Sequence, residues 1–172
     1  MNRALLERQT MRAARTKQTA AIRALGAAGV PFTVRPYPYV AKGGTRASAA
    51  ALGVEEHRVV KTLVMETDAG KPFIVLMHGD RLVSTKQLAR TLGVKRVAPC
   101  KPAVAEKHSG YLVGGTSPFG TRTAMPVYCE AGILDLDSFL INAGARGFLV
   151  EITPEVLVEV LDVTLVEVAA VR

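Results

Sequence analysis

Apolar residues recur at helical spacing in residues 12–28, and most of the other predicted helices are marked by residues that begin or end helices. Thr45, Ser84 or Thr85, and Thr153 can each accept a hydrogen bond from the first turn of a helix, and Pro154 suits the first helical position. Gly29, Gly53 and Gly93 lie where the first three of these helices are expected to end. Helices are therefore predicted over residues 12–28, 45–52, 84–92, 102–108 and from 153 onward.

Between these helices the pattern changes to short apolar or alternating runs, which are typical of strands. The three prolines of residues 31–40 exclude a helix and favour an extended edge segment. Residues 59–65 and 73–77 flank a turn and predict a hairpin, whose second strand is apolar on both faces and is expected to be central. Further strands are predicted over residues 125–129, 139–142 and 147–152. We expect a mixed α/β domain, because hairpin signals recur and no regular βαβ pattern runs through it.

The length of 172 residues and the 49% apolar composition favour one domain, predicted over residues 12–172. Residues 1–11 are expected to be a basic N-terminal extension. The net charge of +7 is concentrated at the start, since residues 1–23 carry six basic side chains and one acidic one. Such a segment suits a polyanion such as RNA, and a solvated helix explains it equally well. No apolar run is long enough to span a bilayer, so no membrane association is expected.

The cysteines and histidines form no recognisable reactive or metal-binding pattern. Cys100 and Cys129 are expected to be reduced thiols of a cytoplasmic protein. The three histidines show no ligand spacing, and no catalytic triad or carboxylate pair can be identified. We therefore expect no metal and no cofactor.

Lys61 is the first candidate for chemistry, because it interrupts an apolar strand. Alternation along a strand favours a lysine that faces solvent. The alternative is a fixed cation at the mouth of a pocket, where it would hold a phosphate or polarise a carbonyl.

The second candidate is the sequence GYLVGGTSPFG at residues 110–120, which carries four glycines and a proline. Gly114 and Gly115 would let a ligand approach the backbone and its N–H groups. Thr116 and Ser117 add hydroxyls, and Pro118 stiffens the exit of the loop. A purely structural corner explains the glycines nearly as well, and neither nucleotide-binding glycine motif is present.

Tyr37 and Tyr39 lie in the proline-rich segment. Exposed aromatic rings on a semi-rigid strand can stack on a base or form the wall of a pocket. Packing against the sheet is the commoner outcome for such residues.

Four stretches together resemble the YbaK/EbsC family of free-standing aminoacyl-tRNA editing proteins, which are related to the editing domain of bacterial prolyl-tRNA synthetase. In chain order they are VVKTLV (59–64), LGVKRV (92–97), GYLVGGTSPFG (110–120) and NAGARG (142–147). The resemblance runs from about residue 12 to the C-terminus. It implies a mixed, partly barrel-like sheet surrounded by helices.

The resemblance also implies roles for individual residues. Lys61 matches the family's essential lysine, which is thought to hold the backbone of the terminal adenosine near the ester. Gly114 and Gly115 match the loop whose amides contact the aminoacyl group, and Tyr37 matches a pocket tyrosine. Cysteine-specific members usually carry Ser at the position of Asn142 and Asp at that of Leu149, so this chain departs from them at two positions. Asn142 can still form hydrogen bonds there.

The implied activity is deacylation of mischarged tRNA in trans. Cys-tRNA(Pro), and also Cys-tRNA(Cys), would be deacylated with the substrate thiol as nucleophile. One alternative is removal of alanine or another small residue from tRNA(Pro) by water. Another is a non-catalytic tRNA- or synthetase-binding module. The expected partners are aminoacyl-tRNA and prolyl-tRNA synthetase, without DNA.

Overall fold

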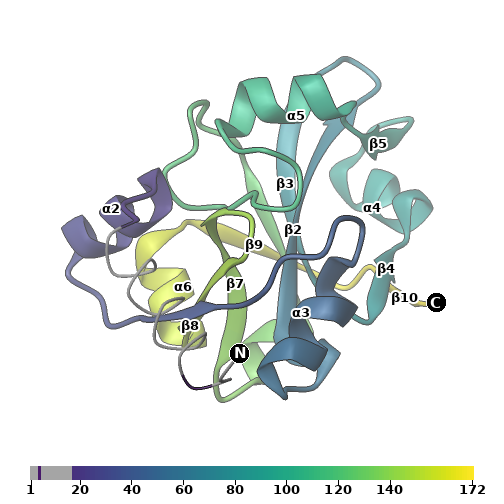
Figure 1. The fold of residues 1–172 in the computed structure, drawn as a ribbon. Helices are drawn as coiled ribbons and strands as arrows, with labels where there is room; N and C mark the ends of the chain where they lie inside the picture. Colours follow the sequence, from purple (N-terminus) through teal and green to yellow (C-terminus); the bar gives the residue numbers. More distant parts are fainter. Residues whose placement is uncertain (1–3, 5–16) are drawn as a thin grey trace.

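The computed structural model describes residue 4 and residues 17–172. Its main sheet is mixed and has the strand order β1-β8-β7-β2-β3-β6-β9, and β5 pairs with the C-terminal end of β2 (Figure 1). The strands of this sheet are β1 (Thr33–Pro36), β2 (Val59–Thr67), β3 (Pro72–His78), β5 (Val97–Pro99), β6 (Val127–Glu130), β7 (Phe139–Ala145), β8 (Phe148–Ile152) and β9 (Val163–Val166). A separate two-stranded ribbon pairs β4 (Arg81–Val83) with β10 (Ala169–Val171).

Helices surround this sheet (Figure 1). They are α2 (Ala20–Ala28), α3 (Gly44–Leu52), α4 (Thr85–Leu92), α5 (Pro102–Ser109) and α6 (Pro154–Val160), with short 3-10 turns η1 (Glu56–Arg58) and η2 (Ala131–Asp135). The predicted mixed α/β class is therefore confirmed. Within residues 17–172, no helix is long and apolar enough to cross a membrane.

Most local predictions are confirmed, because they depend on contacts close in sequence. β2 and β3 form the predicted antiparallel hairpin, and β1 is an edge strand. The hydroxyls of Ser84 and Thr153 cap α4 and α6. Cys100 and Cys129 are free thiols, as expected.

Two local predictions need correction, and four short strands were not predicted. Thr19 caps α2, so this helix begins at Ala20 and not at residue 12 as predicted. Residues 1–3 and 5–16, which include nearly all of the predicted extension, lie outside the described residues. Thr45 lies inside α3, and its hydroxyl instead donates to the Glu56 carboxylate at 2.8 Å. The short strands β4, β5, β9 and β10 escaped prediction because their pairing partners are distant in sequence.

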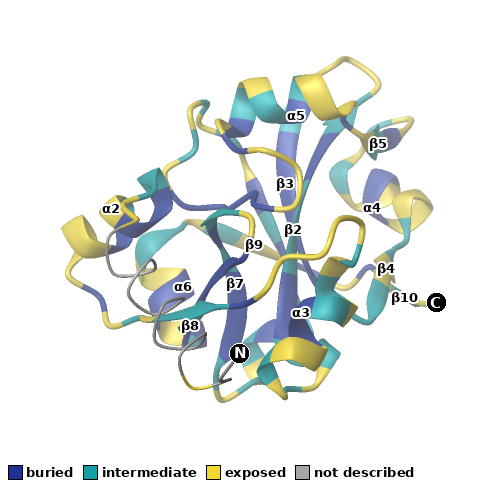
Figure 2. Cartoon of the chain, in the orientation of Figure 1, coloured by how far each residue is buried: buried dark blue, intermediate teal, exposed yellow. Residues whose placement is uncertain are grey.

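The core lies on both faces of β3, which is almost entirely buried (Figure 2). Ile74 and Leu76 pack on one face with Phe139 and Ile141 of β7. Residues of the other face, including Phe73, pack with Leu88 and its neighbours from α4. This two-sided burial confirms the central position predicted from the apolar run.

One edge of β2 is left partly unpaired, and this opening positions the site. On that edge β7 pairs only with Val59 and Val60, whereas β5 pairs from Met65 onward. The Cys100 N–H donates to the Val64 carbonyl at 3.0 Å. Residues 61–63 therefore have no neighbouring strand on that side among the described residues, although β3 pairs with them on the other.

Candidate active site

A cavity of about 920 Å³ lies at the open edge of β2. Its walls come from the segment between β1 and α3, from β2 itself, from the start of α5, from the glycine loop and from the β7–β8 hairpin. Within the described residues, no histidine, aspartate or glutamate lines it. The lining is mainly apolar, with three cationic side chains, Lys42, Lys61 and Arg146.

Five of the eight predicted site residues line this cavity and three do not. The lining residues are Tyr37, Lys61, Gly114, Thr116 and Asn142. The residues outside the lining are Gly115, Ser117 and Pro118. Their chemical roles remain predictions, but the geometry separates residues that can touch a ligand from residues that support the loop.

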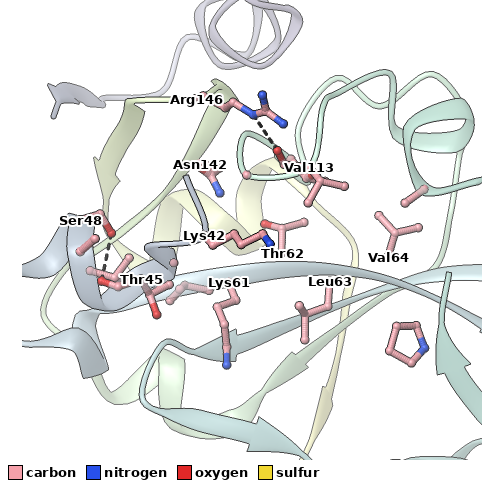
Figure 3. Close-up of a pocket in the computed structure, with 18 of the residues that line it drawn as sticks. Lys42, Thr45, Ser48, Lys61, Thr62, Leu63, Val64, Val113, Asn142 and Arg146 are labelled. Atoms are coloured by element: carbon pink, nitrogen blue, oxygen red, sulfur yellow. Dashed lines mark hydrogen bonds between the residues drawn. The ribbon is translucent and has the colours of Figure 1, made fainter. Parts of the chain in front are cut away.

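Two side-chain oxygens that line the cavity are buried without a hydrogen-bond partner, namely Thr62 Oγ1 and Asn142 Oδ1. Both side chains lie on the same side of β2 (Figure 3). Since alternate residues of a strand direct their main-chain groups to the same edge, the Thr62 N–H and C=O point, like those of Val64, to the open edge. Burying an unpaired polar atom is costly, so such atoms in a pocket indicate a polar ligand.

Lys61 extends to the opposite side of β2 from Thr62 and Asn142 (Figure 3). Its ammonium donates to the Arg81 carbonyl of β4. Burial lowers the pKa of Lys61 below its ordinary value, and nearby Arg172 lowers it further, whereas Glu56 and Asp80 act in the opposite direction. The cavity thus extends around the edge of β2, and Lys61 is a half-buried cation at its far side, not a solvent-facing lysine.

The two central glycines of the loop have steric reasons to be glycine. A Cβ on Gly115 would lie 2.8 Å from the backbone of Ala145 and Arg146, because the loop packs directly on the β7–β8 turn. Gly114 has a positive φ of 92°, and a Cβ there would lie 2.9 Å from the Tyr39 hydroxyl. The Gly115 N–H donates to the Leu112 carbonyl at 2.9 Å, so it is already used inside the loop.

The rest of the loop is a buried support. Ser117 is fully buried, and its hydroxyl accepts the Phe119 N–H. The Tyr111 hydroxyl donates to the Phe119 carbonyl. Only Gly114 and Thr116, together with Val113, reach the cavity from this loop.

Tyr37 and Leu149 form an apolar wall of the cavity. Tyr37 is 8% exposed and packs in one cluster with Leu149. Burial raises the pKa of Tyr37, which keeps its hydroxyl neutral. Leu149 stands opposite Asn142 in the β7–β8 pairing, so the two positions that depart from cysteine-specific members are neighbours in the cavity.

The described residues contain no cluster of three or more histidine, cysteine or acidic side chains that could hold a metal ion. Cys100 lines the cavity, but burial raises the pKa of its thiol to about 11, so the thiol is neutral near pH 7. The arrangement can therefore bind an anion and polarise a carbonyl, whereas it offers no ionised thiol.

Three further polar residues that line the cavity, Thr62, Lys42 and Arg146, do not stand out in the sequence. Thr62 follows Lys61 in an ordinary strand pattern, so only the missing neighbour of β2 reveals it. Lys42 and Arg146 lie in turns whose approach to the cavity depends on the tertiary fold.

A family model, the aminoacyl-tRNA editing domain, matches residues 43–160, which include β2, the glycine loop and the β7–β8 hairpin. The chain therefore belongs to the aminoacyl-tRNA editing domain family, and the resemblance deduced from sequence is confirmed.

The individual relatives agree with this class. The chain is 30% identical over 114 residues to EbsC of Enterococcus faecalis, named as a candidate Cys-tRNA(Pro)/Cys-tRNA(Cys) deacylase, and the match covers 66% of this chain and 70% of that protein. It is also 30% identical over 114 residues to a proline–tRNA ligase of a Geobacter species, and that match covers 64% of this chain and 20% of the ligase. The chain thus corresponds to about a fifth of that ligase.

Solved structures share the fold. A crystal structure of a candidate trans-editing enzyme for prolyl-tRNA synthetase matches with a TM-score of 0.79 at 22% identity, covering 90% of this chain and 99% of that one. A protein described only as hypothetical matches with a TM-score of 0.80 at 22% identity, covering 88% and 99%.

Proposed function

We propose that this protein deacylates mischarged aminoacyl-tRNA in trans, with Cys-tRNA(Pro) as its main substrate. The observation that carries the proposal is the composition of the cavity: cations and unpaired polar oxygens, but no acidic or histidine side chain and no ionised thiol within the described lining. An aminoacyl ester is already activated, so its cleavage needs positioning and polarisation more than a strong base.

In this mechanism the substrate supplies the nucleophile. The cysteine thiol attacks its own ester carbonyl, and a C–S bond forms while the bond from the carbonyl carbon to the ribose oxygen breaks. The thiol proton ends on the ribose oxygen. The products are uncharged tRNA and a cyclic thiolactone, and neither water nor a protein nucleophile is consumed.

The ester-bearing ribose lies, in this proposal, at the open edge of β2, where Lys61 reaches it from one side and Thr62 from the other. One ammonium donor of Lys61 is used by Arg81, which leaves two for the ribose. Thr62 Oγ1 and Asn142 Oδ1 accept hydrogen bonds from the α-ammonium of the amino acid. The Thr62 N–H, in place of the occupied Gly115 N–H, faces the carbonyl.

Leu149 supports a second candidate, the removal of alanine or another small residue by water. Its buried side chain makes the wall next to Asn142 apolar, where cysteine-specific members carry a carboxylate. An apolar wall suits a methyl group as well as a thiol.

The two candidates are separated by a deacylation panel over cysteinyl-, seryl- and alanyl-tRNA(Pro). For the thiol mechanism, we expect cysteine to be released at least about 100-fold faster than serine, because a hydroxyl is a far weaker nucleophile at neutral pH. Rapid alanine release would instead support the water mechanism. Binding of tRNA without turnover of any of the three would contradict both candidates and leave the non-catalytic module.

Replacing Thr62 with valine is expected to lower kcat/KM about tenfold without loss of stability. Valine keeps the shape of the side chain and removes a buried hydroxyl that has no partner, so folding loses no hydrogen bond. Deacylation rates and thermal melts of wild type and Thr62→Val check this. A variant with full activity would contradict the contact between Thr62 and substrate.

A further inference from the structure

Lys42 is the only non-glycine residue with a positive φ in the described part of the chain, at 60°. It is the third residue of a turn closed by a hydrogen bond of 2.9 Å from the Gly43 N–H to the Val40 carbonyl. A positive φ at this position is that of a type II turn, where glycine or asparagine is usual. A lysine there is disfavoured by its Cβ, and such residues concentrate at functional sites.

The turn holds Lys42 over the cavity. Gly43 follows directly before α3, and a Cβ there would lie 2.6 Å from the Ala47 side chain, so this turn packs closely against the first turn of the helix. The Lys42 side chain projects toward Thr62, on the same side of β2 as Asn142 (Figure 3). Lys42 is exposed, and its ammonium forms no hydrogen bond or ion pair with any residue in the described region.

Arg146 supplies a second cation from the β7–β8 turn. Its Nε donates to the Val113 carbonyl at 2.9 Å, and its guanidinium lies 5.4 Å from the centroid of the Tyr39 ring. These two contacts fix the plane of the guanidinium and leave its terminal N–H groups for a ligand. In Figure 3, Lys42 and Arg146 lie on the same side of β2, with Asn142 between them in the view.

The rim of the cavity on the Thr62 side therefore presents two cations and no acidic side chain among the described lining residues. We propose that Lys42 and Arg146 bind the phosphodiester that joins the last two nucleotides of a single-stranded RNA 3′ end, beside the ester-bearing ribose. This inference rests on the proposed function for the identity of the ligand. It assigns the phosphate to Lys42 and Arg146, and it leaves Lys61 to the ribose.

The kinetic test compares two substrates that carry the same ester. One is aminoacyl-tRNA, and the other is the 3′-aminoacyl ester of adenosine, which has no phosphate. Lys42→Met is expected to lower kcat/KM about tenfold on the tRNA and to leave it unchanged on the adenosine ester. Arg46→Met is the matched control, since Arg46 is an exposed cation four residues away that does not line the cavity, and it should change neither rate. An equal loss on both substrates, or no loss on tRNA, would overturn the proposal.

A binding test remains valid even if the protein is not a deacylase. The trinucleotide CpCpA is titrated into wild type, Lys42→Met and Lys42→Arg, with adenosine as the ligand that lacks phosphate. Wild type and Lys42→Arg should bind CpCpA more tightly than Lys42→Met does. Only the affinity for CpCpA should depend on salt, and the logarithm of its binding constant should fall with the logarithm of the salt concentration with a slope of about 0.7 per phosphate bound. If wild type releases no amino acid but this pattern holds, the proposed function fails and the phosphate site stands. If CpCpA binds equally to all three proteins, or to none, the phosphate site fails.

Discussion

Replacing Lys61 with methionine is expected to reduce deacylation about 100-fold while the melting temperature stays the same or rises. Removing a positioned donor from an active site typically costs about 10²–10³ in rate. Methionine retains most of the apolar stem of lysine, so packing against β2 is largely kept. The ammonium is half-buried, and burial lowers its pKa, which means that folding disfavours its charged form.

The stability of this variant reflects two opposing effects. The hydrogen bond to the Arg81 carbonyl is lost, at a cost of about 0.5–1.5 kcal/mol. The cost of desolvating a charge disappears at the same time. Because the folded-state pKa of Lys61 is lowered, this cost is present at neutral pH and declines as the pH rises through the lowered pKa toward 10.5. Any stability advantage of Lys61→Met should therefore shrink at alkaline pH.

The control for this experiment is Lys71→Met, because Lys71 is an exposed lysine of the β2–β3 turn. It should change neither rate nor melting temperature. Steady-state rates on aminoacyl-tRNA and thermal melts are measured for both variants. A Lys61→Met protein that keeps full activity would show that Lys61 does not act on substrate, and one that is strongly destabilised would show that its role is structural.

Replacing Gly115 with alanine is expected to destabilise the fold by about 1–3 kcal/mol, the usual cost of forcing extra atoms into a packed site. The new Cβ would lie 2.8 Å from the backbone of Ala145 and Arg146, and backbone cannot rotate away as a side chain can. Either the loop or the β7–β8 turn must move. Both carry cavity residues, so deacylation should fall as well.

Gly26→Ala is the matched control for this change. Gly26 lies in α2, it has open space around it, and alanine there should stabilise the helix by about 0.5–1 kcal/mol. The free energies of unfolding of the two variants are compared with that of wild type by denaturant titration. A Gly115→Ala protein as stable as wild type would contradict the packing described for the loop.

The candidate site was only partly predictable from sequence. Lys61 and the glycine loop stood out, because a lysine in an apolar strand and paired glycines break the local pattern. The resemblance assigned Lys61 to the terminal adenosine and the amides of Gly114 and Gly115 to the aminoacyl group. In the structure Lys61 lies across β2 from Thr62, and the Gly115 N–H is used within the loop.

The sequence by itself determined the elements whose causes are local: the β2–β3 hairpin, the caps at Ser84 and Thr153, and the edge position of the proline-rich segment. Only the tertiary structure decided where the sheet opens. β7 separates from β2 after Val60 and β5 joins at Met65, so the unpaired edge between them depends on strands about 30 and 80 residues away in the chain. That opening makes Thr62 a candidate ligand contact, because its main-chain N–H and C=O have no neighbouring strand to bond with at this edge.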